Sequence, residues 1–184
     1  MSLKYVILGL LLYKNRTGYQ ISKTMNRSTE FFWHASQSQI YPSLKKLKSE
    51  GLVDIEHVWE KSKVAKIVYS ITDKGRDVLV KWLRKTPDIH QLKDEFFFQL
   101  FFSKDLICDE ELLKKIRHEK EYHQHKLAKY LVYKEKYLER KTNKSDIGRY
   151  LTLMYGIKWE EMSIEFFQYT EQCIKESSID MKCK

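Results

Sequence analysis

Apolar residues recur at helical spacing through most of the chain and alternate with polar residues in one short region. The periodicity predicts helices over residues 2–12, 19–25, 36–50, 73–85, 90–102, 109–141 and 147–177. Between the third and fourth helices, apolar and polar side chains alternate over residues 53–59 and 66–71, which predicts two half-buried strands joined as a hairpin. The predicted fold class is mostly α with a small β component (α+β).

The third predicted helix has two different faces. Ile40, Leu44 and Leu47 are spaced to share one side, and Gly51 follows where the helix should stop. The other side and its flanks carry Ser38, Gln39, Tyr41, Pro42, Lys45, Lys46, Lys48 and Ser49, with no acid before Glu50. Because Pro42 donates no backbone hydrogen bond, we expect the helix to begin shortly before it, with Ser38 or Gln39 as the cap. This surface favours a negatively charged partner, and the alternative is an ordinary core helix with solvated cations.

Charge divides the chain into two parts. Residues 1–85 hold 16 Lys and Arg against 7 Asp and Glu, which is the whole net charge of +9, and the remaining residues hold 18 of each sign. A basic half joined to a neutral half predicts one part that meets a polyanion and one with another task. Thr86 and Pro87 interrupt the helical pattern between them. We therefore predict domains over residues 1–86 and 87–184.

The second half is dominated by two long helices. Ile116, His123, Tyr130 and Tyr137 recur every seven residues in the first of them. Two long helices cannot hide all their apolar faces against each other, which favours a homodimer over a monomeric helical hairpin packed on the first domain. The aromatic residues Phe97, Phe101 and Trp159 are candidates for the lining of an effector pocket, and the alternative is that they belong to the core.

Several classes of function are disfavoured by the sequence. No run of 18 apolar residues indicates a membrane span, and three widely separated cysteines (Cys108, Cys173 and Cys183) favour reduced thiols and a cytoplasmic location. The candidates for catalysis or metal binding are His118, Glu119, His123 and His125. His123 and His125 point apart on a helix, and neither a His-Glu-x-x-His motif nor paired Cys-x-x-Cys motifs occur. We expect no enzyme activity, no metal and no cofactor.

Three helices followed by a basic hairpin form the layout of a winged helix-turn-helix domain. Particular motifs, namely Gly18-Tyr19, Phe32-Trp33-His34-Ala35-Ser36, Ser38-Gln39-Ile40-Tyr41-Pro42 and Val68-Tyr69-Ser70-Ile71-Thr72, resemble the PadR family of transcriptional regulators. Asp94-Glu95-Phe96 and the segment 150–156 are similar to the family's C-terminal virulence-activator-like region. The resemblance implies a bacterial winged-helix regulator that dimerises through its C-terminal helices, usually represses its target, and in many members responds to a small aromatic or drug-like molecule. The hairpin tip, residues 61–66, departs from the family because it lacks Gly and Pro.

A dimer of this kind would place its third helices in successive major grooves of double-stranded DNA. Gln37 and Gln39 are expected to read base edges, Tyr19, Tyr41 and Lys45 to hold phosphates, and the wing to add backbone or minor-groove contacts. The predicted DNA-binding residues are Tyr19, Ser36, Gln37, Ser38, Gln39, Tyr41, Lys45, Lys46, Lys61, Lys63 and Lys66. The alternative function is a winged-helix protein-interaction module, or an activator that acts with a partner protein.

Overall fold

The structure, a computed structural model, describes residues 3–28, 35–59, 66–87, 94–103, 106–139 and 147–177. The chain forms two compact units, Met1–His90 and Gln91–Lys184, and each is treated by itself. Helices predominate over a small antiparallel sheet, which confirms the predicted fold class. The functional division at residues 86 and 87 stays a prediction.

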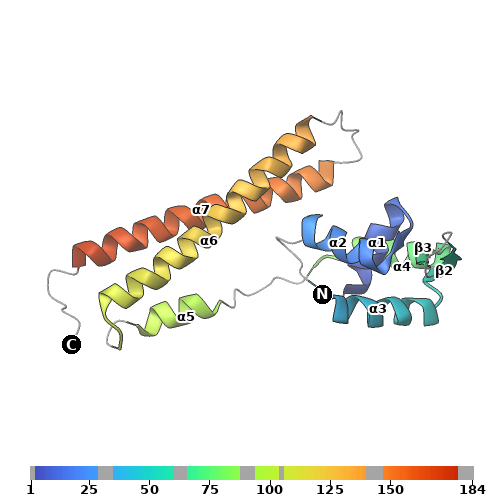
Figure 1. Ribbon diagram of the computed structural model, residues 1–184, viewed down its shortest axis with the longest axis horizontal. Helices are drawn as coiled ribbons and strands as arrows, with labels where there is room; N and C mark the ends of the chain where they lie inside the picture. Colours follow the sequence, from blue (N-terminus) through green and yellow to red (C-terminus); the bar gives the residue numbers. More distant parts are fainter. Residues whose placement is uncertain are drawn as a thin grey trace. The chain divides into compact units, whose positions relative to one another are not determined.

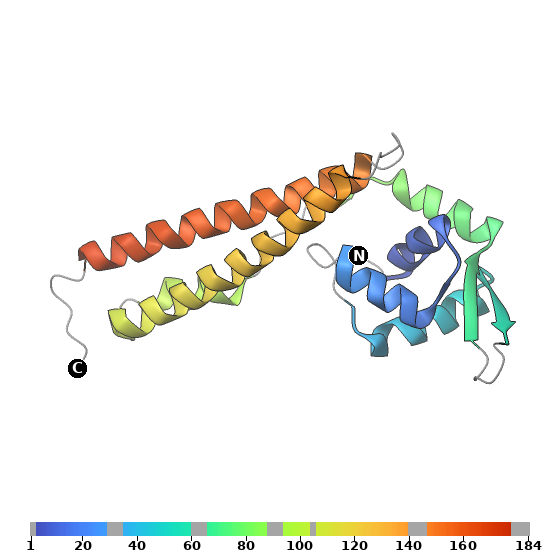
Figure 2. The ribbon, with the colours of Figure 1, turned by 45° about the horizontal axis from the view of Figure 1, so that its top comes forward.

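The first unit is a cluster of four helices with a hairpin at one edge (Figures 1 and 2). Its elements are α1 (Leu3–Tyr13), β1 (Arg16–Thr17), α2 (Gly18–Ser28), α3 (Gln37–Ser49), β2 (Val53–Val58), β3 (Lys66–Ile71) and α4 (Asp73–Leu83). The predicted hairpin is confirmed as β2 and β3, which pair antiparallel with Ile55 opposite Tyr69.

A third strand, β1, was not predicted. Arg16 and Thr17, just before α2, pair with Tyr69 and Val68 of β3, which gives the sheet order β1-β3-β2. Since β2 covers only one edge of β3, the other edge has backbone groups that need partners, and β1 supplies them.

The core of this unit is assembled mainly from α1, α2 and α3. Ile40, Leu44 and Leu47 of α3 are buried, as their spacing predicted, among Ile7, Leu8, Leu11, Ile21, Met25, Ala35, Leu52, Val53 and Leu79. Because Ile40, Leu44 and Leu47 are held in this core, the opposite face of α3 remains exposed.

The segment after α3 packs closely on α4. The backbone at Gly75 comes so near Leu52 that a side chain at position 75 would overlap the carbonyl oxygen of Leu52.

The second unit contains α5 (Glu95–Phe102), α6 (Asp109–Leu138) and α7 (Ile147–Ser177). The predicted bounds of α7 are confirmed. Helix α5 begins later than predicted, because Asp94 has an extended backbone and its side chain caps the helix by accepting a hydrogen bond from the Phe96 N–H at 2.9 Å. Helix α6 ends at Leu138 rather than Lys141.

Helices α6 and α7 lie side by side along most of their length (Figures 1 and 2). The seven-residue repeat of α6 faces α7: Ile116 packs with Phe167, the His123 ring stacks on Phe167 with centroids 5.5 Å apart, and Tyr137 stacks on Tyr150 at 5.3 Å. Residue numbers rise along one helix as they fall along the other, so the pair is antiparallel. The apolar stripe of α6 thus packs against α7 of the same chain.

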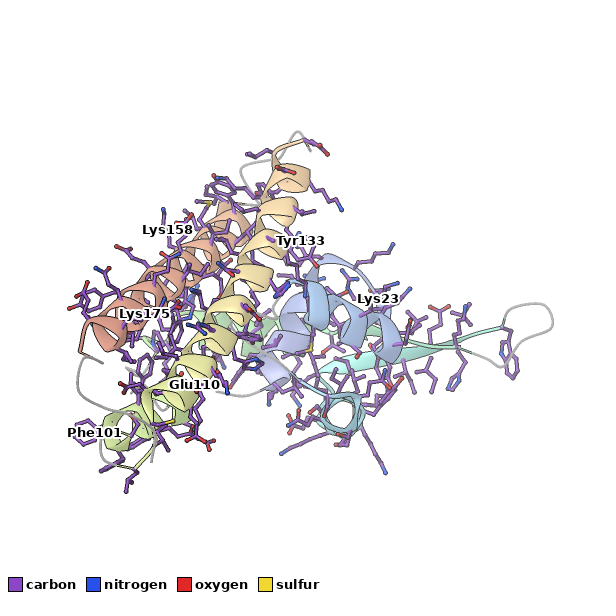
Figure 3. The ribbon with its side chains drawn as sticks, turned by 60° about the vertical axis from the view of Figure 1, so that its left-hand side comes forward. Lys23, Phe101, Glu110, Tyr133, Lys158 and Lys175 are labelled. Atoms are coloured by element: carbon purple, nitrogen blue, oxygen red, sulfur yellow. The ribbon has the colours of Figure 1, made fainter. Side chains whose placement is uncertain are left out.

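Two carboxylates of α7 are buried against α6 and are paired with cations. Glu160 is 1% exposed and lies 2.5 Å from Nδ1 of His123 and 3.4 Å from Nζ of Lys126. Burial is the largest single influence and lowers the pKa of Lys126, but Glu160, Tyr130 and Tyr122 together outweigh it, so the pKa of Lys126 is raised. Glu171 lies 2.5 Å from Lys120, 2.9 Å from Lys175 and 3.0 Å from Arg117, and Lys175 is marked in Figure 3. Hydrogen bonds from Lys120, Lys175 and Arg117 lower the pKa of Glu171 to about 2.

The cysteines do not all conform to the sequence-based expectation. Cys173 is a free thiol, but Cys108, the N-cap of α6, is disulfide-bonded. The expectation of reduced thiols is therefore wrong for Cys108, because spacing along the chain does not indicate which thiols meet in space. Among the helices that the structure describes, none is long and apolar enough to cross a membrane.

We predict that Glu171→Gln lowers the stability of the second unit in a pH-dependent way. Because the pKa of Glu171 is depressed from 4.5 to about 2 in the folded state, its charge stabilises the fold above pH 4.5. This contribution is lost as the pH falls from 4.5 towards 2. The stability gap between the variant and the wild type should be full at pH 7 and close over that window. Urea unfolding followed by circular dichroism checks this.

The matched control is Glu121→Gln on α6, an exposed carboxylate without an ion pair in the described part of the chain. It should leave stability nearly unchanged. A Glu171→Gln gap of the same size at pH 7 and pH 2 would contradict the assigned role of the charge.

Candidate nucleic-acid interface

The start of α3 is fixed by a capping box. Ser36 is the N-cap; its backbone N–H donates to Oε1 of Gln39 at 3.1 Å, and its carbonyl accepts from the N–H groups of Gln39 and Ile40 at 3.0 and 3.1 Å. The predicted cap at Ser38 or Gln39 is therefore wrong. Pro42 lies further inside the helix than expected and is tolerated because it removes only one bond, to the Ser38 carbonyl.

The end of α3 is fixed by Gly51 and by contacts to two other helices. Gly51 has a φ of 69°, and the N–H groups of Gly51 and Leu52 donate to the carbonyls of Lys48 and Leu47 at 3.0 and 2.9 Å, a Schellman motif. The Glu50 carboxylate accepts from Lys4 of α1 at 2.7 Å, and its carbonyl accepts from Lys74 of α4 at 2.8 Å. The hydrogen bond from Lys4 is the main reason that the pKa of Glu50 is lowered. The acid nearest the cationic face is thus already paired.

The predicted DNA-binding residues of α3 all lie on its exposed side: Ser36, Gln37, Ser38, Gln39, Tyr41, Lys45 and Lys46. Lys45 makes no ion pair with any described residue, whereas Lys48 approaches Asp54 at 3.5 Å. Their place on the surface follows from the buried triad, since successive residues advance by about 100° around a helix. The result is one continuous polar and cationic face.

Helix α2 begins against this face. Its N-cap is Thr17, whose N–H donates to Oε1 of Gln20 at 2.9 Å while the Gln20 N–H donates to Oγ1 of Thr17 at 3.2 Å. Gly18 is buried beneath the Tyr41 ring, and Tyr19 beside it is exposed. Sequence reasoning missed both capping boxes and the contact of Gly18. The Thr-x-x-Gln and Ser-x-x-Gln patterns indicate the boxes, but no local pattern indicates the contact.

The described part of the wing consists of strands β2 and β3. Lys66, the first residue of β3, is exposed at the described edge of the hairpin, opposite Val58. Lys61 and Lys63 lie outside the described residues. Trp59, the residue that follows β2, is 78% exposed.

The three candidate effector residues do not line one described cavity. Phe97 packs against Phe166 with ring centroids 5.6 Å apart, Phe101 is 79% exposed beside Phe102, and Trp159 lies on α7 and is 41% exposed. Figure 3 shows Phe101 extending from α5. A groove of about 480 Å³ between α5 and α6 is lined instead by Glu95, Phe96, Gln99, Lys114, Lys115, His118 and Glu119.

Two of the three histidines of α6, His123 and His125, make contacts within the second unit. His123 faces Glu160, and Nδ1 of His125 lies 2.8 Å from the carbonyl of Glu121. Within the described ranges, no group of His, Cys, Asp and Glu side chains is arranged to hold a metal ion.

Comparisons with known proteins agree with this architecture. Residues 7–81 match the transcriptional regulator PadR-like family, and residues 92–175 match the family described as virulence activator alpha C-term. The negative transcriptional regulator PadR of Bacillus subtilis is 41% identical over 101 residues, which is 54% of this chain and 56% of that regulator. The aligned part thus spans about half the length of this curated relative.

Solved structures of the Bacillus subtilis protein cover more of the chain. PadR in complex with operator DNA superposes with a TM-score of 0.82 at 32% identity, over 94% of this chain and 98% of that one. PadR in complex with p-coumaric acid gives a TM-score of 0.75 at 31% identity over the same shares.

The three-helix cluster, the antiparallel hairpin and the exposed cationic helix define a winged helix-turn-helix transcriptional regulator, to which a helical second unit is attached. More narrowly, the chain belongs to the PadR-like family of transcriptional regulators. The known relatives are regulators of transcription and not enzymes.

Proposed function

We propose that this chain binds double-stranded DNA in a sequence-specific way through the exposed face of α3. The observation that carries the proposal is that α3 has a buried apolar face and an exposed polar and cationic face. Its apolar residues are buried in the core, the acid at its C-terminal end, Glu50, is paired with Lys4, and Tyr41 and Lys45 remain exposed on one face. A helix so held presents donors and cations in a fixed arrangement, as entry into a major groove requires. The relative solved in complex with operator DNA supports DNA binding by this chain.

Within this interface, Gln37 and Gln39 are assigned to base edges, with Ser36 and Ser38 beside them. Tyr19, Tyr41, Lys45 and Lys46 are assigned to phosphates, and Lys61, Lys63 and Lys66 of the wing to flanking backbone or minor groove. We also propose a cytoplasmic location, because a DNA-binding regulator must reach the DNA that it controls.

We further propose that the regulator is a homodimer joined through α7. Side chains facing away from α6 are apolar and exposed at intervals of three or four residues: Ile147, Leu151, Tyr155, Trp159, Met162, Phe166 and Tyr169. At about 100° per residue they lie within about a third of the helix circumference. Spacing of this kind is that of a coiled-coil seam, and a second copy of the same helix is its natural partner. A two-fold dimer also matches two half-sites about 34 Å apart on DNA.

The name of one relative, a negative transcriptional regulator, supports repression as the direction of regulation. We propose repression of a palindromic operator, with release by a small aromatic effector such as the p-coumaric acid found with the solved relative. The effector site is proposed in the second unit, with Phe97, Phe101 and Trp159 as candidate contacts that no single described cavity brings together. An activator that acts with a partner protein is the alternative, since the second matched family is named for a virulence activator.

We predict that selection from a random pool of duplexes yields a palindromic site with two half-sites. If the dimer neutralises about 6 to 10 phosphates, affinity for that site should fall by roughly 10³ to 10⁵ between 50 and 200 mM salt. Gln37→Ala should lower the preference for the selected base by about 1–3 kcal/mol. Lys45→Gln should weaken all duplexes alike and reduce the salt slope by about 1 per contact.

The control is Lys136→Gln, the same charge change on an exposed position of α6, which should leave affinity and slope unchanged. Enrichment of no sequence, with binding that is flat across the salt range, would contradict DNA recognition by α3 and favour the protein-interaction module.

We expect sedimentation equilibrium to give twice the chain mass of 22.3 kDa. Tyr155→Lys, in the middle of the apolar stripe, should give the monomer mass because an ammonium group would be buried in the seam. Gln168→Lys, exposed on α7 but outside the stripe, should remain dimeric. Dimers in both variants would place the interface elsewhere.

The effector proposal is tested by adding phenolic acids to the complex of wild-type protein and selected DNA. An active compound should release DNA and quench Trp fluorescence, and Trp159→Phe should remove most of the quenching. Compounds that quench without releasing DNA, or none that act, would count against effector control at this site.

A further inference from the structure

Gly18, the first residue of α2, lies directly beneath the aromatic ring of Tyr41 on α3. A Cβ atom built at Gly18 would lie 2.7 Å from Cε1 and 3.1 Å from Cζ of that ring. Carbon atoms in contact are normally about 3.5–4.0 Å apart. The ring therefore occupies the space that any side chain at position 18 would need.

The backbone of α2 does not itself require glycine at this position. Gly18 is helical, and among the described glycines Gly51 is the one with a positive φ. The capping box of Thr17 and Gln20 already holds the helix start. Alanine is a better helix former than glycine. The absence of a side chain at position 18 is thus explained by the Tyr41 ring and not by the conformation of the chain.

Gly75 shows the contrasting case. A side chain there would meet the backbone carbonyl of Leu52, which cannot move without disturbing the fold. At Gly18 the obstructing atoms belong to the outer edge of a side chain that is 48% exposed. A larger residue at position 18 would therefore displace the Tyr41 ring and leave the fold in place.

A second residue borders the same phenol. Burial, and then the neighbouring Tyr41, raise the pKa of Tyr69 on β3. The Tyr41 ring is confined where it meets Gly18 of α2, while its own helix fixes its Cα. Such confinement reduces the rotamer freedom that would otherwise be lost on binding.

We propose that Gly18 is a positioning residue that sets the Tyr41 hydroxyl at the edge of the α3 face where a DNA phosphate docks. This inference rests on the proposed function, because it assigns Gly18 a role in DNA binding through Tyr41. A hydrogen bond from a phenol to a charged phosphate is directional, so a displaced ring loses it.

The test compares Gly18→Ala with Gly9→Ala, whose added methyl group meets open space in α1. Both variants should melt at or slightly above the wild-type temperature, because both place alanine in a helix. Gly18→Ala should weaken binding to the selected duplex by about tenfold or more, the usual effect of one hydrogen bond to a charged group, and Gly9→Ala should not. The NMR signals of the Tyr41 ring should shift in Gly18→Ala alone.

A double-mutant cycle separates positioning from a general structural effect. In a Tyr41→Phe background, which lacks the hydroxyl, Gly18→Ala should change affinity by less than about twofold. If Gly18→Ala alone does not fold, Tyr41→Ala and the double variant Gly18→Ala/Tyr41→Ala replace it, since removing the ring removes the overlap, and their melting temperatures should agree.

Wild-type affinity in Gly18→Ala, or an equal loss in both backgrounds, would overturn the positioning role while leaving DNA binding intact. An unshifted Tyr41 ring would do the same. Absence of binding by the wild type to any duplex would instead refute the proposed function, and the positioning role with it.

Discussion

The rotational setting of α3 about its own axis is the constraint on which the first unit depends. A rotation by one residue would turn the helix by about 100° and exchange Tyr41 or Lys45 for a core residue on the exposed face. Burial of Ile40, Leu44 and Leu47 prevents such a rotation, because each exposed Leu or Ile would forfeit roughly 1.5–3 kcal/mol. The ends are held independently, by Ser36 at the start and by the bonds of Lys4 and Lys74 to Glu50 at the end. A surface built on this helix is therefore nearly as rigid as the core beneath it.

In the second unit the corresponding constraint is the register of α6 against α7, and it is set by charge as well as by apolar packing. Glu160 and Glu171 point into the helix pair, where each meets cations or a histidine of α6. Sliding one helix by a turn would leave a buried carboxylate without its partners, at a penalty of about 3–5 kcal/mol. Apolar contacts alone tolerate such slips more easily. Because α6 packs on one face of α7, the opposite face of α7 is left exposed, which explains how a chain with one long helical hairpin retains a second apolar stripe.

Local periodicity explains what could be predicted from the sequence. The buried triad of α3, the hairpin of β2 and β3 and the bounds of α7 each depend on a repeat that is visible within one segment. Features that depend on two distant segments were missed. Strand β1 has only two residues and exists because β3 offers an edge, and the pairs of Glu160 and Glu171 depend on the register of two helices. At the candidate interface, the exposure of Tyr41 and Lys45 could be predicted from the helical pattern. The packing of the Tyr41 ring on Gly18 could not, because it depends on how closely α2 approaches α3.

The capping box also distinguishes the two glutamines that sequence reasoning treated alike. Bidentate recognition of adenine uses the amide oxygen as acceptor and the amide nitrogen as donor. In the unbound protein the oxygen of Gln39 already accepts from the Ser36 N–H, whereas Gln37 makes no hydrogen bond through its side chain to any described residue. Turning Gln39 towards a base would open a cap that contributes about 0.5–2 kcal/mol, against the 1–3 kcal/mol that a good bidentate pair supplies. Gln39 therefore gains less than Gln37 by reading a base, because it also holds the helix start. Base preference in this regulator should accordingly be stronger at the position facing Gln37 than at the position facing Gln39.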